Sequence, residues 1–309
     1  MSLDPTAAEN EIRAAALRWM QSQYETHGGT VPRRVLEYGF EFQGHRVTVI
    51  GPAGIWKPRQ LELIPLSITS VPSGPYDDTF TEDGLLVYQY RGSDPGHRDN
   101  MGLREAMRTR TPLIYLHGVG SGRYLPVWPV FVVEDNPHGL FCSVAIDPAY
   151  ALGANPLQMG PPPDDGESIL GVRKYVAAHI RRRLHQMRFR ESVLAAYASR
   201  CSFCRLRHRE LLDAAHIISD TLPHGEPKIQ NGLCLCKIHH AAFDQSIVGI
   251  APDYSLHIRN DVLSEEDGPM LRHGLQELNN EHLILPARRA DRPDPKRLEQ
   301  RFEEFLKSG

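Results

Sequence analysis

Two pairs of metal-type ligands, about thirty residues apart, most strongly constrain how this chain folds. The segment "CSFC" supplies Cys201 and Cys204, and "CKIH" supplies Cys236 and His239 at the same spacing. Two ligands separated by two residues can bind one tetrahedral ion, and a Cys₃His set is typical of a closed structural zinc site. The spacing therefore predicts a zinc site that joins the two segments. If the C-x-x-C motif is considered alone, the alternative to a metal site is a redox-active pair of cysteines.

The use of cysteine supports metal binding over disulfides. The chain has five cysteines, an odd number, and four of them lie between residues 201 and 236. Cys234 alternates with Cys236 in "LCLC", so on a strand its side chain faces the other way and is predicted to be part of the core. The sequence has no long apolar run and no secretory leader pattern. We therefore expect a cytoplasmic location and no membrane partner.

Hydrophobic patterning predicts an α+β fold with two domains. Short runs of β-branched and aromatic residues, separated by Gly, Pro and Asp, fill residues 38–150 and predict a curved antiparallel sheet or barrel. Strand patterns recur around the cysteine cluster and over residues 247–258. Helical periodicity is found at four places: 10–26, 100–110, 167–200 and 293–307. The predicted organisation is an N-terminal domain over 1–152, a Gly/Pro-rich linker over 153–166, and a C-terminal domain with leading basic helices over 167–309.

Positive charge is concentrated just before the cysteine cluster. Residues 167–213 contain eleven Lys and Arg against four Asp and Glu, although the whole chain has a net charge of −3. Such a basic segment favours binding to a phosphate backbone, with a solvated helix face as the alternative. The residues predicted to contact DNA phosphates are Arg181, Arg182, Arg183, Arg188 and Arg190.

The segments "DAAHI" and "QNGLCLCKIHHAAFD", set between the two ligand pairs, resemble the HNH nuclease family. The resemblance covers about residues 197–260 and implies a zinc-stabilised ββα-metal domain that hydrolyses phosphodiester bonds. By this resemblance, His216 is the general base, Asn231 keeps His216 oriented, and His240 belongs to the catalytic set. A neutral imidazole suits a general base because its ordinary pKa lies near neutrality.

A second metal site is predicted from helix geometry. His240 and Asp244 are four residues apart, so on a helix they share a face and can hold a divalent ion such as Mg²⁺ or Mn²⁺. His239 points elsewhere, toward the zinc. Many members of the HNH family carry a metal ligand just before the general base, but Ala215 stands there in this chain. Asp213 is the candidate replacement, and a strand-edge carboxylate is the alternative.

The N-terminal domain carries a second resemblance, over about residues 70–135. The segments "GPYDD", "VYQYRG", "RDNMGLREAM" and "PLIYL" resemble the SRA domain, a PUA-like barrel that flips a modified cytosine out of duplex DNA. The resemblance implies that Tyr76 and Tyr90 stack on the base, and that Asp78 or Asp77 accepts a hydrogen bond from its amine. Arg91 stands where the family tends to have a small hydroxyl residue, which affects how the 5-substituent fits.

The two resemblances together predict a modification-dependent restriction endonuclease. Its partner is double-stranded DNA that contains 5-methyl- or 5-hydroxymethylcytosine, its cofactors are structural Zn²⁺ and a catalytic divalent ion, and its role is defence against foreign DNA. Cleavage of both DNA strands needs two active sites, so a homodimer is expected. The alternatives are an HNH restriction enzyme that reads an unmodified sequence, and a DNA-binding protein whose nuclease centre is inactive.

Overall fold

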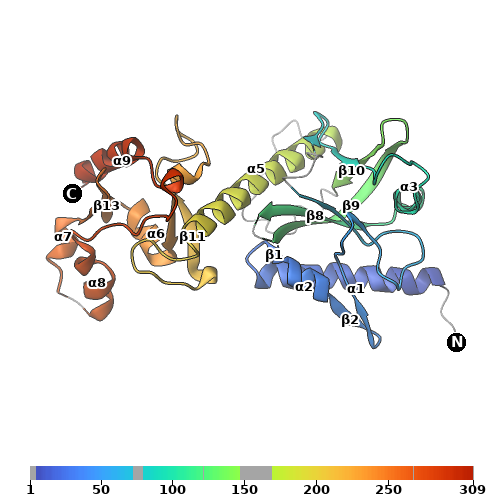
Figure 1. Cartoon of the computed structure of the whole chain (residues 1–309), viewed down its shortest axis with the longest axis horizontal. Helices are drawn as coiled ribbons and strands as arrows, with labels where there is room; N and C mark the ends of the chain where they lie inside the picture. The colour runs from blue at the N-terminus through green and yellow to red at the C-terminus, as the bar shows by residue number, and fades with distance from the viewer. Residues whose placement is uncertain (1–4, 72–78, 121, 147–168, 267, 309) are drawn as a thin grey trace. The chain divides into compact units, whose positions relative to one another are not determined.

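The computed structural model describes residues 5–71, 79–120, 122–146, 169–266 and 268–308 (Figure 1). The chain divides into two compact units, Met1–Leu184 (unit 1) and His185–Gly309 (unit 2). The division falls within a long helix, α5 (Ile169–Ala196), which matches the helical prediction for 167–200. The predicted linker, 153–166, lies outside the described residues.

Unit 1 contains one large sheet, a separate small hairpin and several helices. Its helices besides α5 are α1 (Pro5–Thr26), α2 (Arg33–Tyr38) and α3 (Arg98–Thr109). Its strands are β1 (Val31–Pro32), β2 (Phe40–Phe42), β3 (His45–Val47), β4 (Ile55–Trp56), β5 (Ser67–Ser70), β6 (Thr79–Phe80), β7 (Leu86–Gln89), β8 (Leu113–Gly120), β9 (Arg123–Asn136) and β10 (Phe141–Ile146). The predicted helices at 10–26 and 100–110 are confirmed as α1 and α3.

The large sheet curls as a half-barrel. Its strands follow the order β4-β5-β8-β9-β10-β7-β6, with β1 paired to β9, and β2 and β3 form a separate hairpin. The pairing is antiparallel except between β5 and β8, where Ser70 is the register partner of His117. Among the described strands, β4 and β6 remain edges, so the described sheet is open and corresponds to the curved sheet, the first of the two predicted forms, and not to a closed barrel.

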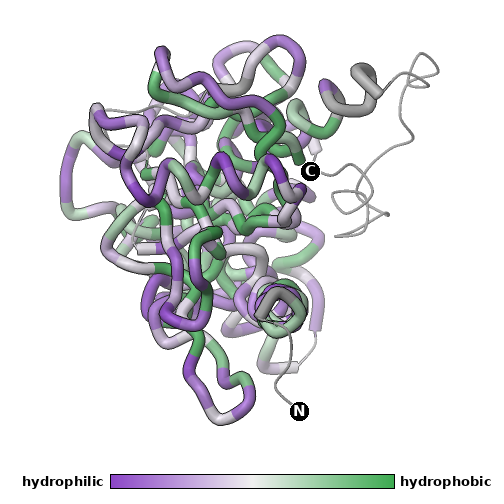
Figure 2. The backbone as a smooth tube through the Cα atoms, turned by 90° about the vertical axis from the view of Figure 1, so that its right-hand side faces the viewer, coloured by the Kyte–Doolittle hydropathy of each residue, from purple (hydrophilic) through white to green (hydrophobic). Residues whose placement is uncertain are grey.

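Helix α1 covers part of this sheet with the apolar face that its periodicity predicts. Ile12, Ala16 and Met20 recur every four residues and are buried in one cluster with Ile114 and Leu116 of β8. Figure 2 shows hydrophobic and hydrophilic stretches alternating along the backbone of the described residues. No helix in the described part of the chain has the length and apolarity that a membrane crossing requires.

Unit 2 combines two short hairpins with helices. Its strands are β11 (Leu212–His216), β12 (Gly232–Cys236), β13 (Val248–Ile250) and β14 (Leu256–Ile258). Its helices are α6 (Lys237–Asp244), α7 (Asn260–Leu263), α8 (Pro269–Gly274) and α9 (Pro295–Ser308), with 3₁₀ turns η1 (Arg209–Leu211), η2 (Ile229–Asn231), η3 (Gln276–Leu278) and η4 (Arg289–Asp291). The order β11, β12, α6 is the ββα arrangement that the resemblance to HNH nucleases implies, and α9 confirms the predicted C-terminal helix.

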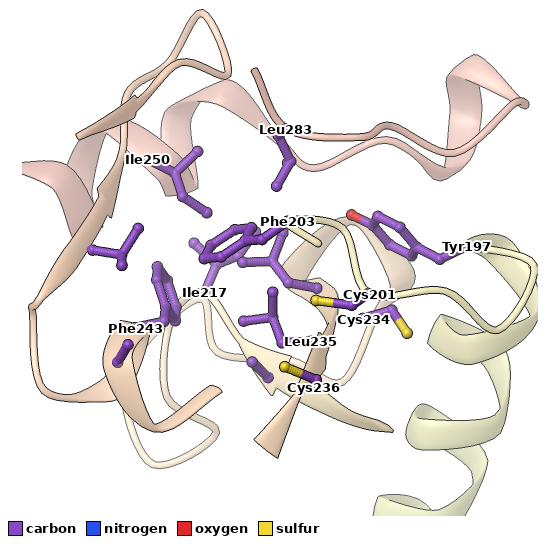
Figure 3. Packing of buried hydrophobic residues seen from close by; sticks show 14 of the residues in the cluster. Tyr197, Cys201, Phe203, Ile217, Cys234, Leu235, Cys236, Phe243, Ile250 and Leu283 are labelled. Carbon is purple, nitrogen blue, oxygen red and sulfur yellow. The ribbon is translucent and has the colours of Figure 1, made fainter. Parts of the chain in front are cut away.

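The core of unit 2 joins these elements. Phe203, Ile217, Leu235 and Phe243 belong to one buried cluster, with Ile250 of β13 in the same cluster (Figure 3). Burying side chains of this size contributes about 1.5–3 kcal/mol each to folding. The core therefore supports both the β11–β12 hairpin and helix α6, which carry the predicted site residues.

Candidate functional site

The four predicted zinc ligands converge on one point. The ligand atoms of Cys201, Cys204, Cys236 and His239 all lie within 4.8 Å of one another. The Nδ1 atom of His239 lies 3.4 Å from the Cys201 sulfur and 3.3 Å from the Cys236 sulfur. Three sulfurs and one imidazole nitrogen are the donor set of a tetrahedral zinc site, so these residues fit the predicted ion.

A contact outside the ligand set fixes the His239 ring. Its Nε2 atom lies 2.7 Å from the carbonyl oxygen of Gly274, and the ring centroid lies 5.2 Å from that of Phe203. An N–H at Nε2 that donates to this carbonyl leaves Nδ1 unprotonated and directed at the thiols. Metal-binding histidines are commonly oriented in this way.

The thiols also compete for ionisation. Hydrogen bonds with Cys201 and Cys204 lower the pKa of Cys236, whereas hydrogen bonds with Cys201 and Cys236 raise the pKa of Cys204. A divalent cation among the thiols favours all three thiolates together. Cys234 takes no part in the cluster: it is buried in the hydrophobic core, as its alternation with Cys236 predicts.

The β11–β12 pairing places His216 at the end of the hairpin. His216 is the register partner of Gly232, the residue after Asn231. A Cβ atom on Gly232 would lie 2.4 Å from Val193 and 3.0 Å from the Phe189 ring, both on α5. Only glycine therefore lets α5 pack so closely against the hairpin. This packing brings Phe189 to His216.

His216 is half-buried against an aromatic ring. The rings of Phe189 and His216 are stacked, with centroids 4.1 Å apart and planes 19° apart. The Nε2 atom of His216 is buried and has no hydrogen-bond partner among the described residues. Burial lowers the pKa of His216 below its ordinary value of 6.5, because it disfavours the charged imidazolium. The imidazole is therefore neutral at pH 7, the state that a general base requires.

Asn231 holds the chain segment that follows His216. Its side-chain Oδ1 accepts from the backbone N–H of Ile218 at 2.9 Å, and its Nδ2 donates to the carbonyl of the same residue at 2.9 Å. A third bond runs from Nδ2 to the carbonyl of Glu226 at 3.2 Å. Asn231 is fully buried, so its amide serves as an internal tie and not as a group exposed to substrate.

His240 and Asp244 share one face of α6, as their spacing predicts. The Nε2 atom of His240 lies 3.4 Å from an Asp244 carboxylate oxygen. Asp213 approaches the opposite ring nitrogen, with its carboxylate 3.8 Å from Nδ1, and Arg190 lies 3.8 Å from the other Asp213 oxygen. The Asp213 carboxylate raises the pKa of His240, and His240 in turn lowers the pKa of Asp213. One imidazole nitrogen and one carboxylate can thus hold a divalent ion on the Asp244 side of the ring.

These groups meet at a cavity of about 260 Å³. His216, His240 and Asp244 line it together with residues from the loop after β11 and from α9. The lining residues are His216, Ile217, Ile218, Ser219, Asp220, Leu222, His240, Asp244, Arg301 and Glu304. The cavity therefore joins the predicted base to the predicted ion-holding pair, with Asn231 supporting the loop behind them.

The predicted phosphate-contacting arginines differ in their surroundings. Arg181 and Arg182 are exposed, whereas Arg183, Arg188 and Arg190 are half-buried. The guanidinium of Arg183 lies 4.9 Å from the centroid of the Tyr24 ring, within unit 1. Arg190 donates to the carbonyl of Leu212 at 2.7 Å in addition to pairing with Asp213. Arg181 and Arg182 are thus the most accessible members of the predicted set.

The predicted base pocket of unit 1 falls largely outside the described residues. Tyr76, Asp77 and Asp78 lie within 72–78, which the structure does not describe. Tyr90 is buried, and its hydroxyl donates to the Asp135 carboxylate.

Arg91 has polar partners close by. It forms an ion pair with Asp99 at 2.6 Å, and its backbone N–H donates to Asn100 at 2.9 Å. These contacts tie the segment after β7 to helix α3. The roles proposed for Tyr76, Asp77, Asp78 and Tyr90 stay predictions.

Two residues of the site are missing from the sequence predictions. Phe189 lies in a segment singled out for its positive charge and helical periodicity, and Arg301 lies in a segment singled out for its helical periodicity alone. Helical periodicity places both on helices, but nothing local marks them as partners of His216 or Asp244. Their positions depend on how α5 and α9 pack against the hairpins of unit 2.

Comparison with known proteins finds a family match for part of unit 2. Residues 201–251 match the HNH endonuclease family, and no curated protein matches the chain. Among solved structures, the chain is similar to a modification dependent TagI restriction endonuclease, with 16% sequence identity, 78% of this chain and 81% of that chain covered, and a TM-score of 0.29. The matched family segment contains β11, β12, α6 and the whole Cys₃His cluster. Residues 201–251 are thus an HNH endonuclease domain, and this domain makes the chain an endonuclease.

Proposed function

We propose that this endonuclease is a modification-dependent enzyme that acts on double-stranded DNA. Unit 2 hydrolyses the phosphodiester backbone, and unit 1 selects DNA that contains 5-methyl- or 5-hydroxymethylcytosine. The observation that carries the hydrolytic half is the convergence of His216, His240 and Asp244, all within the HNH segment, on one cavity. The biological role that fits such a pairing is defence against foreign modified DNA.

His216 is the general base of the proposed reaction. The neutral imidazole takes a proton from a water molecule as the water oxygen attacks phosphorus. The bond between phosphorus and the 3′-oxygen breaks, and the 3′-oxygen leaves with the electron pair and takes a proton from solvent. The products carry a 5′-phosphate and a 3′-hydroxyl. Stacking on Phe189 and the Asn231 tie behind the loop hold the imidazole in place.

His240 and Asp244 would hold the catalytic divalent ion, Mg²⁺ or Mn²⁺ among the candidates. The fit rests on the donor pair 3.4 Å apart at the cavity wall. When bound, such an ion supplies positive charge that stabilises the phosphate transition state and the departing oxygen. The Cys₃His cluster would hold Zn²⁺ in a structural role, since a closed four-ligand site leaves no position for substrate.

Unit 1 is the proposed reader. Three of the sequence pieces that resemble an SRA domain, "VYQYRG", "RDNMGLREAM" and "PLIYL", coincide with β7, α3 and β8, whereas "GPYDD" lies outside the described residues. The half-barrel sheet is compatible with the resemblance. A flipped base needs flat partners on both faces and hydrogen bonds to its Watson–Crick edge. Tyr76 and Tyr90 would supply the flat partners, and Asp78 or Asp77 would accept the hydrogen bond from the base. Two copies of the chain would act together, because each HNH centre cuts one strand.

A metal titration tests the hydrolytic half. After the zinc site is filled, the wild-type chain is expected to bind one further Mn²⁺ by calorimetry, and His240→Ala is expected to weaken that binding at least tenfold, in line with losses of metal ligands and their partners. Ala215 is buried and offers no ligand, which favours the alternative of an inactive nuclease centre on a DNA-binding chain. Absence of a second Mn²⁺ site in the wild type would select that alternative.

A further inference from the structure

Helix α9 lies outside the segment that matches the HNH family, yet it is built into unit 2. Its Leu298 is fully buried, and the Phe305 ring packs so closely on β13 that a Cβ atom on Gly249 would lie 2.5 Å from it. The backbone N–H of Asp294, just before the helix, donates to the carbonyl of Gln230 at 3.0 Å. Contacts at both ends of α9 therefore fix the helix against the nuclease domain.

Arg301 extends from α9 onto the C-terminal end of α6. Its Nη2 donates to the carbonyls of Phe243 at 3.0 Å and Asp244 at 3.2 Å, and its Nη1 donates to Glu304 at 2.7 Å. A cation is favoured there because the last carbonyls of a helix carry partial negative charge. These contacts use at most three of the five N–H donors of a guanidinium. The group is thus held in one orientation with donors to spare.

Arg301 also lines the cavity that contains the proposed base and the ion-holding pair. Carboxylates contribute most of the formal charge on this lining: Asp220, Asp244 and Glu304. Among the described residues that line the cavity, Arg301 supplies the only guanidinium or ammonium group. A phosphodiester is an anion, so its approach to this wall is favourable only where a cation faces it.

We infer that Arg301 binds a non-bridging oxygen of the scissile phosphate and stabilises the negative charge that develops there during attack by water. The inference rests on the proposed function of unit 2, and it adds a catalytic residue from outside the HNH segment. A guanidinium suits this role because its planar fork of donors matches phosphate oxygens. Anchoring by the two carbonyls lowers the reorganisation needed when the charge appears.

The competing explanation is that Arg301 only caps α6 and so keeps Asp244 in place. Arg301→Gln separates the two explanations, because glutamine retains an amide donor for the carbonyls but has no charge. Arg259→Gln is the matched control. Arg259 also belongs to unit 2, pairs with Asp261 at 2.7 Å, and does not line the cavity.

The experiment measures single-turnover cleavage of plasmid DNA that contains 5-methyl- or 5-hydroxymethylcytosine, with the full-length chain, zinc and saturating Mn²⁺. Mn²⁺ affinity and thermal unfolding are measured on the same proteins. Arg301→Gln is expected to slow cleavage by about 10²–10³-fold, the usual cost of losing one donor to a developing oxyanion. Its Mn²⁺ affinity is expected to stay within threefold of the wild type, and Arg259→Gln is expected to cleave at the wild-type rate.

Cleavage by Arg301→Gln within threefold of the wild type would overturn the inference. A parallel loss of Mn²⁺ affinity would also overturn it, because Arg301 would then act by holding α6. If Arg301→Gln does not fold, Arg301→Lys is judged by the same two measurements, with at least tenfold slower cleavage expected. If the wild type cuts neither plasmid, the proposed function of the whole chain is wrong. This result is distinct from one in which the wild type cuts the DNA and only the role of Arg301 is contradicted.

Discussion

The ring of Phe189 lies flat against the ring of His216, with centroids 4.1 Å apart and planes 19° apart. One residue comes from α5, ahead of the HNH segment, and the other ends strand β11. The contact excludes water from one face of the imidazole and limits its rotation. The helix before the HNH domain therefore supports the proposed general base, in addition to the role in DNA binding that its charge predicts.

Replacing Phe189 is expected to reduce both stability and catalysis. Phe189→Ala removes a buried ring, and it should lower the free energy of unfolding by about 3–5 kcal/mol. Phe189→Leu keeps an apolar side chain but loses the flat stack, so it should unfold closer to the wild type and still cleave DNA more slowly. Urea unfolding and single-turnover cleavage test the pair. Wild-type cleavage by Phe189→Leu would show that the stack has no catalytic role.

The rate of cleavage is expected to fall at acid pH through protonation of His216. Burial holds the pKa of His216 below 6.5, and the imidazolium that forms below this pKa cannot accept a proton from water. At saturating metal, the logarithm of the rate should therefore be level at neutral pH and fall with unit slope around a midpoint below 6.5. His216→Ala should cleave about 10²–10⁴-fold more slowly and lack this dependence. A midpoint at or above 6.5 would contradict the assignment.

The zinc assignment predicts different results for two cysteines on one strand. Cys236→Ala removes a ligand and should yield protein with less than one zinc per chain and a lower unfolding temperature. Cys234→Ala removes an equally buried thiol from the core and should retain the zinc. Elemental analysis and thermal unfolding of the two variants make the comparison. Equal zinc loss in both would show that Cys234 belongs to the site.

Asp213 is expected to position His240 without binding the catalytic ion. Its carboxylate lies 3.8 Å from Nδ1, whereas Asp244 lies 3.4 Å from Nε2. Asp213→Asn keeps an acceptor for an Nδ1–H donor, so it should retain more Mn²⁺ affinity than Asp213→Ala, which should lose about 10–100-fold. Equal and large losses in both variants would support the ligand role that the sequence suggested for Asp213.

Local sequence patterns predicted the Cys₃His cluster because it depends on short spacings, and the resemblance to HNH nucleases implied the ββα order. Cys201 and Cys204 lie at a turn, whereas Cys236 ends β12 and His239 lies on α6. His240 and Asp244 meet because a helix repeats every 3.6 residues. The alternation in "LCLC" likewise separated Cys234 from Cys236 correctly.

Contacts between distant segments were not predictable in the same way. The Phe189–His216 stack depends on Gly232 leaving room for α5, and nothing in the periodicity of either segment indicates it. Arg301 reaches α6 only because α9 packs on β13. The open edges of the large sheet depend on the pairing of strands far apart in the chain, so strand texture alone left a curved sheet and a barrel as alternatives.

The measurement that tests the central claim most directly is cleavage of four otherwise identical duplexes. They carry cytosine, 5-methylcytosine, 5-hydroxymethylcytosine or glucosylated 5-hydroxymethylcytosine, and each is tested with Mg²⁺ and with Mn²⁺, with His216→Ala as the control. We expect the wild type to cut one or more of the modified duplexes, to leave the cytosine duplex intact, and to lose cleavage in the control. Equal cutting of all four would retain the nuclease but contradict the reader role of unit 1.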